Sequence, residues 1–433
     1  MADDRQLAGT ATATGGTSAG EPPAKPVAPA KRAPSILDVA EPEKPLPLPE
    51  MLQIAARDYG KTLSQMVSEM AKLSFGPGRI GADEYFDLRL FDDKGLAGAD
   101  KRAFVGMRGS KAIGLAANRN EHWYAIVSDK LTFYTLMTGY GLPTIRQKAL
   151  YHPSLDLPAL GMLKSEEELK RFLTDPANLP LFGKPCNSSL SLGTVAIDGL
   201  DGESGRLRLS GGQSADPEKL ASDIVANYRT GYMLQEKLVP HPELERLVGS
   251  RIGTIRVYTI CGRDGPEVFR VCWKVPAGAN MADNYWRKGN MLAALDVETG
   301  EIRRVIRGYG LNQTEIESHP DTGERMVGAR IPGWNDILKL ALWGAKVVNH
   351  VPLIGWDIAQ TARGPVLVEA NNTPDFRLVE MAERRGVLDE RLKGFLEHMK
   401  GVYERAEARH TEKLKGLRRR HITKVFDSIK RPA

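Results

Sequence analysis

Two carboxylates and an amide in the last third of the chain have the spacing of a cation site. Residues 355–372, GWDIAQTARGPVLVEANN, have a pattern typical of two strands around an Arg-Gly-Pro turn. If this hairpin is centred on Arg363, Asp357 lies directly opposite Glu369, and Asn371 shares their face because side chains alternate along a strand. Such oxygens would repel one another unless a hard cation lay between them, and Mg²⁺ bound with nucleotide phosphates prefers oxygen ligands. The pattern predicts a magnesium site, with a pair of solvated carboxylates on an edge hairpin as the alternative.

The segments before this hairpin must form the scaffold that positions it. Ser165, followed by three glutamates, predicts the start of a helix. A helical pattern of apolar residues runs from Leu48 to about Phe75. Short segments rich in β-branched or aromatic residues and bounded by Gly, Pro or Asp are predicted as strands, namely 181–184, 193–198, 231–238, 253–261 and 267–274. The sequence therefore predicts a mixed fold of helices and strands.

Two glycine-rich matches to catalytic motifs are set aside. Residues 16–20 spell G-x-S-x-G, but no strand precedes them to present the serine as a nucleophile. Residues 76–81 match G-x-G-x-x-G, but they follow a helical pattern and contain Pro77, whereas a dinucleotide fingerprint follows a strand. We interpret residues 76–81 as a turn between helices.

The composition excludes several classes of protein. With 433 residues, 42% of them hydrophobic, the chain is long enough for two or three domains with sizeable cores. No apolar run approaches the roughly 18 residues of a membrane span, and no apolar segment follows the N-terminus, so we expect a cytoplasmic protein. Cys186, Cys261 and Cys272 lack metal-site spacing and are expected to be reduced thiols, which argues against zinc.

The two ends of the chain differ from its middle. Residues 1–45 are rich in Ala, Gly, Thr, Pro and Lys, and they are predicted to be disordered because they bury too little surface to offset chain entropy. Much of the net charge of +6 lies between Lys413 and Lys430. This basic tail could contact nucleic acid, anionic lipid or an acidic partner, but we favour a solvated terminal helix because short charge runs usually face water.

The hairpin residues resemble a known family. Asp357, Glu369 and Asn371, an acidic residue followed by Glu-x-Asn, resemble the magnesium-binding end of ATP-grasp enzymes, which include D-alanine-D-alanine ligase and glutathione synthetase. More narrowly, IGWDIAQTARGPVLVEANNTPDF together with GTIRVYTI is similar to the sugar-transfer-associated ATP-grasp family, related to α-L-glutamate ligases and found beside polysaccharide biosynthesis genes. The resemblance covers roughly Tyr85 to Arg377 and implies an α+β ATP-grasp fold whose two lobes clasp ATP.

The same resemblance implies phosphate-binding residues upstream. Lys130, in an Asp-Lys-Leu element, matches a family lysine that contacts ATP phosphates. Lys184 matches the second ATP lysine, at a strand end before the flexible phosphate-covering loop. That loop, residues 187–193, has fewer glycines than the family norm, but its backbone N–H groups and serine hydroxyls can still hold phosphate. Ser189 and Gly193 are the expected contacts.

The strand over residues 232–238 matches the family's hinge between the two lobes. In that interpretation, the backbone of Glu236, Lys237 and Leu238 recognises the adenine edge, and His241 or Glu243 lies near the ribose. Ordinary polar alternation on a strand is the alternative.

The resemblance also implies residues that act on the transferred group. Arg256 matches the family's strand arginine, whose guanidinium would stabilise charge on the phosphoryl group, and Lys274 is predicted to act with it. Residues 283–290 resemble the loop that closes over the acceptor.

We therefore expect an enzyme that uses ATP and Mg²⁺ to join a carboxylate to an amine or similar nucleophile through an acyl-phosphate. The resemblance implies a role in polysaccharide or cell-surface glycan biosynthesis. The alternatives are a sugar or alcohol kinase on the same fold, or a non-catalytic ATP-binding module. No specific nucleic-acid partner is expected, and the oligomeric state is left open. The expected organisation is a disordered tail (1–45), a helical region (46–125), a first ATP-grasp lobe (126–240), a second lobe with the metal site (241–400) and a basic helix (401–433).

Overall fold

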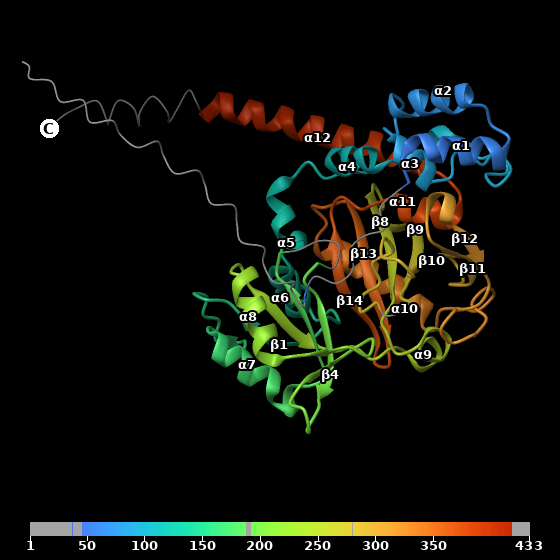
Figure 1. The fold of residues 1–433 in the computed structure, drawn as a ribbon. Coiled ribbons are helices and arrows are strands. Elements are labelled where there is room, and N and C mark those ends of the chain that lie inside the picture. The colour runs from blue at the N-terminus through green and yellow to red at the C-terminus, as the bar shows by residue number, and fades with distance from the viewer. Residues whose placement is uncertain (1–36, 38–45, 188–191, 279, 418–433) are drawn as a thin grey trace, which may run out of the picture. The chain divides into compact units, whose positions relative to one another are not determined.

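Two β-sheets position the residues singled out above (Figure 1). The computed structural model describes residues 37, 46–187, 192–278 and 280–417. Within these residues the strands form two seven-stranded sheets, with strand orders β2-β1-β7-β3-β4-β5-β6 and β12-β11-β10-β9-β8-β13-β14. Neighbouring strands are antiparallel except for the parallel pair β1 and β2.

The first sheet is built from residues in the middle of the chain and the second from residues that follow. The first contains β1 (Gln147–Tyr151), β2 (Met162–Leu163), β3 (Leu181–Pro185), β4 (Val195–Leu200), β5 (Leu207–Leu209), β6 (Ser214–Ala215) and β7 (Tyr232–Glu236). The second contains β8 (Thr254–Gly262), β9 (Gly265–Val275), β10 (Met291–Leu295), β11 (Ile302–Arg307), β12 (Thr314–Ile316), β13 (Leu353–Thr361) and β14 (Gly364–Asn371). The five predicted strands correspond to β3, β4, β7, β8 and β9, with ends that differ by one or two residues.

The helices lie before, between and after these strands. They are α1 (Leu48–Tyr59), α2 (Leu63–Ser74), α3 (Ala82–Asp87), α4 (Met107–Ala117), α5 (Tyr124–Ser128), α6 (Lys130–Gly139), α7 (Glu166–Thr174), α8 (Pro217–Asn227), α9 (Pro242–Val248), α10 (Trp334–Val347), α11 (Arg377–Glu383) and α12 (Glu390–Leu417). Short 3₁₀ turns occupy Lys101–Ala103, Glu121–Trp123, Pro176–Asn178 and Gly310–Asn312.

The helix starts follow local sequence signals. Ser165 caps α7 as predicted, and its hydroxyl accepts a hydrogen bond of 3.2 Å from the Glu168 N–H. The apolar pattern from Leu48 onward is interrupted, because Gly60 adopts a left-handed conformation with φ of 69° and ends α1. A capping box between Thr62 and Gln65 then starts α2. Residues 76–81 form the expected turn between helices α2 and α3.

The second sheet is buried on both faces. Along β8, Ile255 and Val257 belong to a core that includes α10, whereas Tyr258 and Ile260 belong to a core formed with the N-terminal helices, α11 and α12. A third core packs α7 and α8 against the first sheet. Burial of both faces explains why residues of β8 and β13 are buried one after another rather than alternately. Strand β13, which carries Asp357, is therefore held from both sides, whereas the core residues of β14 all belong to the core that includes α10.

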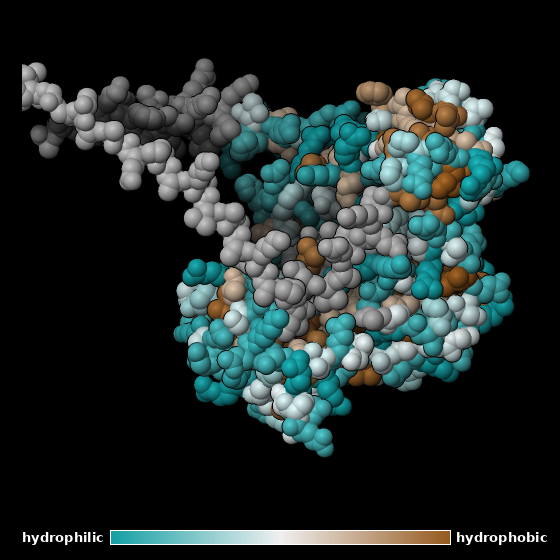
Figure 2. All heavy atoms as spheres, in the orientation of Figure 1, coloured by the Kyte–Doolittle hydropathy of each residue, from teal (hydrophilic) through white to brown (hydrophobic). Residues whose placement is uncertain are grey.

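The surface and the ends of the chain add few constraints. Figure 2 shows apolar side chains gathered over the N-terminal helices, where Leu63, Val67 and Phe75 are exposed. No helix within the described residues has both the length and the apolar character to cross a membrane. The predicted disordered tail and most of the basic tail lie outside the described residues.

Glu380 joins the N-terminal helical region to the second sheet's helices. This carboxylate on α11 is fully buried, and it accepts hydrogen bonds from the backbone N–H groups of Val105 (2.9 Å) and Val387 (3.0 Å). Burial raises the pKa of Glu380 well above its usual value, against the opposing effect of these N–H donors. The side chain therefore satisfies two backbone groups that no water can reach.

The Glu380→Ala variant is expected to lose about 2–4 kcal/mol of unfolding free energy, because it leaves two buried N–H groups without an acceptor. Urea denaturation would measure the loss. Glu380→Gln, which resembles the neutral acid and keeps one acceptor oxygen, should retain most of the stability. Equal losses in both variants would contradict this interpretation.

Candidate functional site

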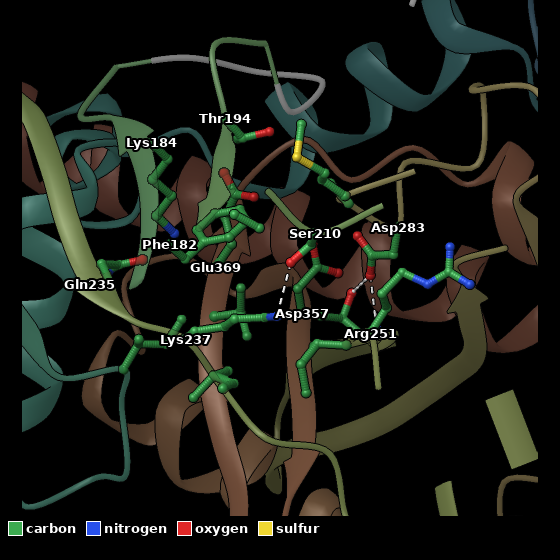
Figure 3. A pocket seen from close by; sticks show the side chains of 18 of the residues that line it. Phe182, Lys184, Thr194, Ser210, Gln235, Lys237, Arg251, Asp283, Asp357 and Glu369 are labelled. Atoms are coloured by element: carbon green, nitrogen blue, oxygen red, sulfur yellow. Dashed lines mark hydrogen bonds between the residues drawn. The ribbon is translucent and has the colours of Figure 1, made fainter. Parts of the chain in front are cut away.

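One cavity collects most of the predicted site residues from both sheets (Figure 3). It contains roughly 1040 Å³ of empty space, part of it open to solvent. Its polar lining comes from α6, β3, β7, β9, β13 and β14 and includes Lys130, Lys184, Gln235, Glu236, Lys237, Lys274, Asp283, Asp357 and Glu369. Phe182, Ile145, Ala196, Leu238, Met281 and Val368 contribute apolar surface.

The β13–β14 hairpin places Asp357 opposite Glu369, as predicted, but through a different register. The strands close at the pair Thr361 and Gly364, so the turn has two residues and is not centred on Arg363. A β-bulge at Val368 then shifts the pairing by one residue. Without the bulge Glu369 would point to the other face of the sheet, because a slip of one residue reverses side-chain direction. The bulge thus brings the two carboxylates to one face.

Asp357 is held in a buried ion-pair network. Arg256 donates two hydrogen bonds to its carboxylate, at 2.6 and 2.9 Å, and Lys274 donates a third at 3.0 Å. Burial by itself would raise the pKa of Asp357, but the two cations outweigh it and lower the pKa to about 2. Lys274 shows the reverse balance, since burial would lower its pKa but Asp283 and Asp357 raise it. The three side chains remain charged across the physiological pH range.

Glu369 and Asn371 complete the predicted ligand set on β14. The Glu369 carboxylate forms an ion pair of 3.1 Å with Lys130, which is the first residue of α6 and is nearly buried. The Asn371 amide nitrogen donates to the Gly355 carbonyl at 3.3 Å, which directs its amide oxygen away from that strand. Asn371 stands outside the cavity lining, two residues beyond Glu369.

These donors fit a magnesium ion that shares its coordination with phosphate oxygens. Among the described residues there is no group of three or more carboxylate, histidine or cysteine side chains that could hold a metal. Asp357, Glu369 and Asn371 offer two carboxylates and one amide oxygen, and Mg²⁺ is commonly bound by one or two carboxylates plus substrate phosphates. Each carboxylate oxygen has lone pairs beyond those used by Arg256, Lys274 and Lys130.

Lys184 presents a second cation to the cavity from β3. Its ammonium donates a hydrogen bond of 2.8 Å to the Tyr134 hydroxyl and lies 5.0 Å from the centre of that ring. Burial lowers the pKa of Lys184 to about 8, against the opposing attraction of Glu369 and Asp357. A lysine with this pKa is mostly protonated at neutral pH.

Strand β7, predicted as the hinge, brings a buried amide to the cavity. Gln235 is fully buried, and its amide makes no well-formed hydrogen bond with the described residues, although it approaches the Tyr134 hydroxyl closely enough to oppose the rise in the pKa of that phenol. Figure 3 shows the side chains of Lys184, Gln235 and Lys237 within one cavity. A buried amide without well-formed hydrogen bonds is costly unless a ligand supplies them, so this position fits a polar planar group such as a nucleobase edge.

The residues after Gln235 are anchored by their side chains. Lys237 contacts the Asp198 carboxylate and donates a hydrogen bond of 2.9 Å to the Ser210 hydroxyl. The Glu236 carboxylate forms an ion pair of 2.6 Å with Arg363, in the turn of the β13–β14 hairpin. Both side chains are engaged, and the Glu236 backbone N–H donates a hydrogen bond of 3.0 Å to the Arg146 carbonyl.

Among the predicted nucleotide-binding residues, two do not line the cavity and a third lies outside the described residues. His241 precedes α9, where its ring nitrogen accepts a hydrogen bond of 3.3 Å from the Glu243 N–H, and it does not line the cavity. Gly193 does not line it either. Its φ of 73° and a Tyr228 hydroxyl 2.0 Å from where a Cβ would lie show that this position requires glycine for steric reasons. Ser189 lies outside the described residues.

Arg256 acts on the cavity indirectly, because it does not line the cavity itself and binds Asp357 from behind. Asp283 does reach the lining, where its carboxylate accepts a hydrogen bond of 2.8 Å from the Thr254 N–H and lies 3.5 Å from Lys274. Sequence reasoning missed Gln235, Ser210, Thr194 and Arg251 as lining residues. Only Gln235 carried a signal, as a polar residue next to the predicted hinge contacts.

The chain belongs to the sugar-transfer associated ATP-grasp family, which it matches over residues 115–396. This confirms the α+β ATP-grasp fold and the family resemblance. Members of this fold family are typically ATP-dependent ligases that form carbon–nitrogen bonds. No curated protein matches the chain.

Solved structures that resemble the chain are distant in sequence. The D-alanine-D-alanine ligase from Coxiella burnetii is 12% identical with a TM-score of 0.39, over 67% of this chain and 62% of the ligase. The chain therefore spans less than two thirds of that ligase. The VanG D-Ala:D-Ser ligase from Enterococcus faecalis is 15% identical with a TM-score of 0.35, over 65% of this chain and 63% of its own.

Proposed function

We propose that this chain binds ATP with Mg²⁺ in the cavity and uses it to join a carboxylate to an amine through an acyl-phosphate. One observation carries the proposal. Three lysines, Lys130, Lys184 and Lys274, converge on a cavity that also holds the carboxylates of Asp357 and Glu369. Such a mixture of cations and oxygen ligands is what a nucleotide polyphosphate with its metal requires.

The chain's residues divide the recognition of ATP between them. Lys130 and Lys184 would bind the phosphate oxygens as point charges. Asp357, Glu369 and Asn371 would hold Mg²⁺, which neutralises charge on the phosphates when it is bound. Residues 235–238 would take the base, since the buried amide of Gln235 can form hydrogen bonds with a ligand and the backbone follows it along the same wall.

The reaction proceeds in two displacements in this proposal. A substrate carboxylate oxygen attacks the γ-phosphorus, ADP leaves, and an acyl-phosphate forms. An amine then attacks the acyl carbon, phosphate leaves, and an amide results. Lys274, held by Asp357 and Asp283, lies at the cavity wall and would stabilise negative charge on the transferred group. No side chain needs to act as a covalent nucleophile.

The family suggests the class of substrate. An association with sugar transfer favours a sugar carboxylate, such as a uronic acid, or an amino acid that becomes part of a glycan. The role in polysaccharide biosynthesis rests on this family association alone.

The Glu369→Ala variant is expected to lose Mg²⁺-dependent ATP affinity by at least about tenfold, because one carboxylate ligand and the partner of Lys130 are removed. Isothermal titration calorimetry of ATP, with and without Mg²⁺, would measure the change. Glu245→Ala, which removes an exposed carboxylate on α9 outside the cavity, is the matched control. If the wild type bound no ATP under either condition, the proposal would be wrong.

The products separate ligation from phosphorylation of an alcohol. A ligase releases free phosphate together with a new amide, whereas a kinase leaves the phosphoryl group on its acceptor. Incubation with ATP, uronic acids and amino acids, followed by mass spectrometry of the products, would distinguish the two reactions.

A further inference from the structure

The hydroxyl of Tyr134 connects the two sheets inside the cavity wall. Tyr134 follows Lys130 by one helical turn on α6, so both side chains project from the same face of the helix. Lys130 reaches Glu369 on β14, and Tyr134 reaches the residue before it, Val368. The helix therefore holds two consecutive residues of the same strand.

The directions of the hydrogen bonds at this hydroxyl are fixed by chemistry. The Lys184 ammonium has no lone pair and cannot accept a hydrogen bond, so it must donate to the Tyr134 oxygen, at 2.8 Å. The single proton of the hydroxyl is then directed to the Val368 carbonyl, at 2.6 Å. Lys184 belongs to the first sheet and Val368 to the second, so one side chain bridges the sheets through a two-step chain of hydrogen bonds.

The β-bulge makes this bridge possible. Val368 is the extra residue between the pairs Asp357–Glu369 and Ile358–Leu367, so it has no directly opposed partner on β13. The feature that directs Glu369 into the cavity thus also presents a carbonyl to Tyr134. Tyr134 is itself almost fully buried, at 2% exposed, so the groups that approach its hydroxyl come from the protein: Lys184, the Val368 carbonyl and the Gln235 amide.

We propose that Tyr134 is a positioning residue that ties Lys184 to the bulge of β14, so that a phosphate-binding lysine and the carboxylate of Glu369 are held as one unit. This inference rests on the proposed function of the cavity. Tyr134 acts through Lys184 and does not contact the nucleotide in this account. Removing its hydroxyl should therefore matter only when Lys184 is present.

The Tyr134→Phe variant is expected to bind Mg²⁺-ATP about tenfold more weakly than the wild type, because a hydrogen bond to a charged group is lost. In the Lys184→Met background the same change should alter affinity by less than about twofold, because the hydrogen bond to Lys184 is already absent. Free-energy effects of substitutions are additive for independent residues and non-additive for residues that act through each other. Calorimetry on all four proteins completes the double-mutant cycle.

Tyr403→Phe is the matched control. Its hydroxyl also donates to a backbone carbonyl, that of Ala117 at 2.7 Å, but it lies outside the cavity lining. It should cost similar thermal stability and leave ATP affinity unchanged. If the wild type binds ATP but Tyr134→Phe binds equally well, or weakens binding equally in both Lys184 backgrounds, the inference is overturned while the proposed function stands.

A second measurement does not depend on nucleotide. Acylation of lysines, followed by peptide mass spectrometry, should show Lys184 labelled several-fold faster in Tyr134→Phe, because the ammonium loses its acceptor, whereas exposed Lys339 should be unaffected. Unchanged labelling of Lys184 would overturn the inference. If the wild type binds no ATP, the proposed function is wrong, and the role assigned to Tyr134 in nucleotide binding is wrong with it.

Discussion

The Asp357→Ala variant is expected to lose about 3–5 kcal/mol of unfolding free energy, because removing one partner of a buried ion pair leaves uncompensated charge. Arg256 and Lys274 are both buried and both donate to this carboxylate, so the variant strands two cations at once. Urea denaturation monitored by tryptophan fluorescence would measure the loss. The expected effect exceeds that of any other single substitution in the cavity.

Glu369→Ala provides the comparison. Glu369 is 34% exposed along its side chain and has one lysine partner, so its removal should cost less than about 1 kcal/mol of stability. The variants of the two metal-ligand candidates are thus predicted to differ in stability, since Asp357 supports the fold as well as the site. Similar stability losses in both variants would show that the ion-pair network contributes little.

The Asp357 network also predicts a pH dependence of stability. The pKa of Asp357 in the folded chain, about 2, lies below the ordinary value of about 3.9 for an unfolded aspartate. A depressed pKa means that the stabilisation is fully present above the unfolded pKa and is lost as the pH falls from about 4 towards about 2. Asp357→Asn should lack this acid-dependent loss, which thermal unfolding across that pH range would test.

From the sequence, the residues that pair in the hairpin could be predicted more accurately than the geometry of its turn and strands. Asp357 and Glu369 do lie opposite each other. The observed turn is one residue shorter than the turn predicted around Arg363, and the extra residue at the Val368 bulge restores the pairing of the two carboxylates. Nothing in the run Val366-Leu367-Val368 indicates which residue forms the bulge, because all three side chains are apolar, branched and similar in size. Bulges depend on packing against other elements, here α6, which local sequence does not encode.

Motifs with fixed spacing led to residues that line one cavity, whereas contacts between distant segments did not follow from the motifs. Lys130, Lys184 and Lys274 reach the cavity as expected. Tyr134 could not have been singled out from the sequence, since its proposed role depends on contacts with both β3 and β14, which belong to different sheets. The family resemblance placed His241 or Glu243 near the ribose, but the ring of His241 caps the start of α9 and does not line the cavity.

ATP affinity is expected to fall as the pH rises through about 8, because Lys184, the phosphate contact proposed above, then loses its proton. Burial lowers the pKa of this lysine to about 8, and phosphate oxygens prefer its charged form. Binding therefore requires protonation above this pH, and the affinity should decrease about tenfold for each further pH unit. At pH 9.5 the wild type should bind roughly thirtyfold more weakly than at pH 7.5.

Lys184→Arg separates this effect from other titrations, because a guanidinium stays charged throughout the range. Its affinity at neutral pH should be lower than that of the wild type, since the longer group cannot keep the single contact with Tyr134, but it should remain nearly constant up to pH 9.5. Calorimetry at constant ionic strength would measure both profiles. An equally steep decline in Lys184→Arg would assign the titration to another group, and a flat wild-type profile would mean that the ammonium stays protonated despite its burial.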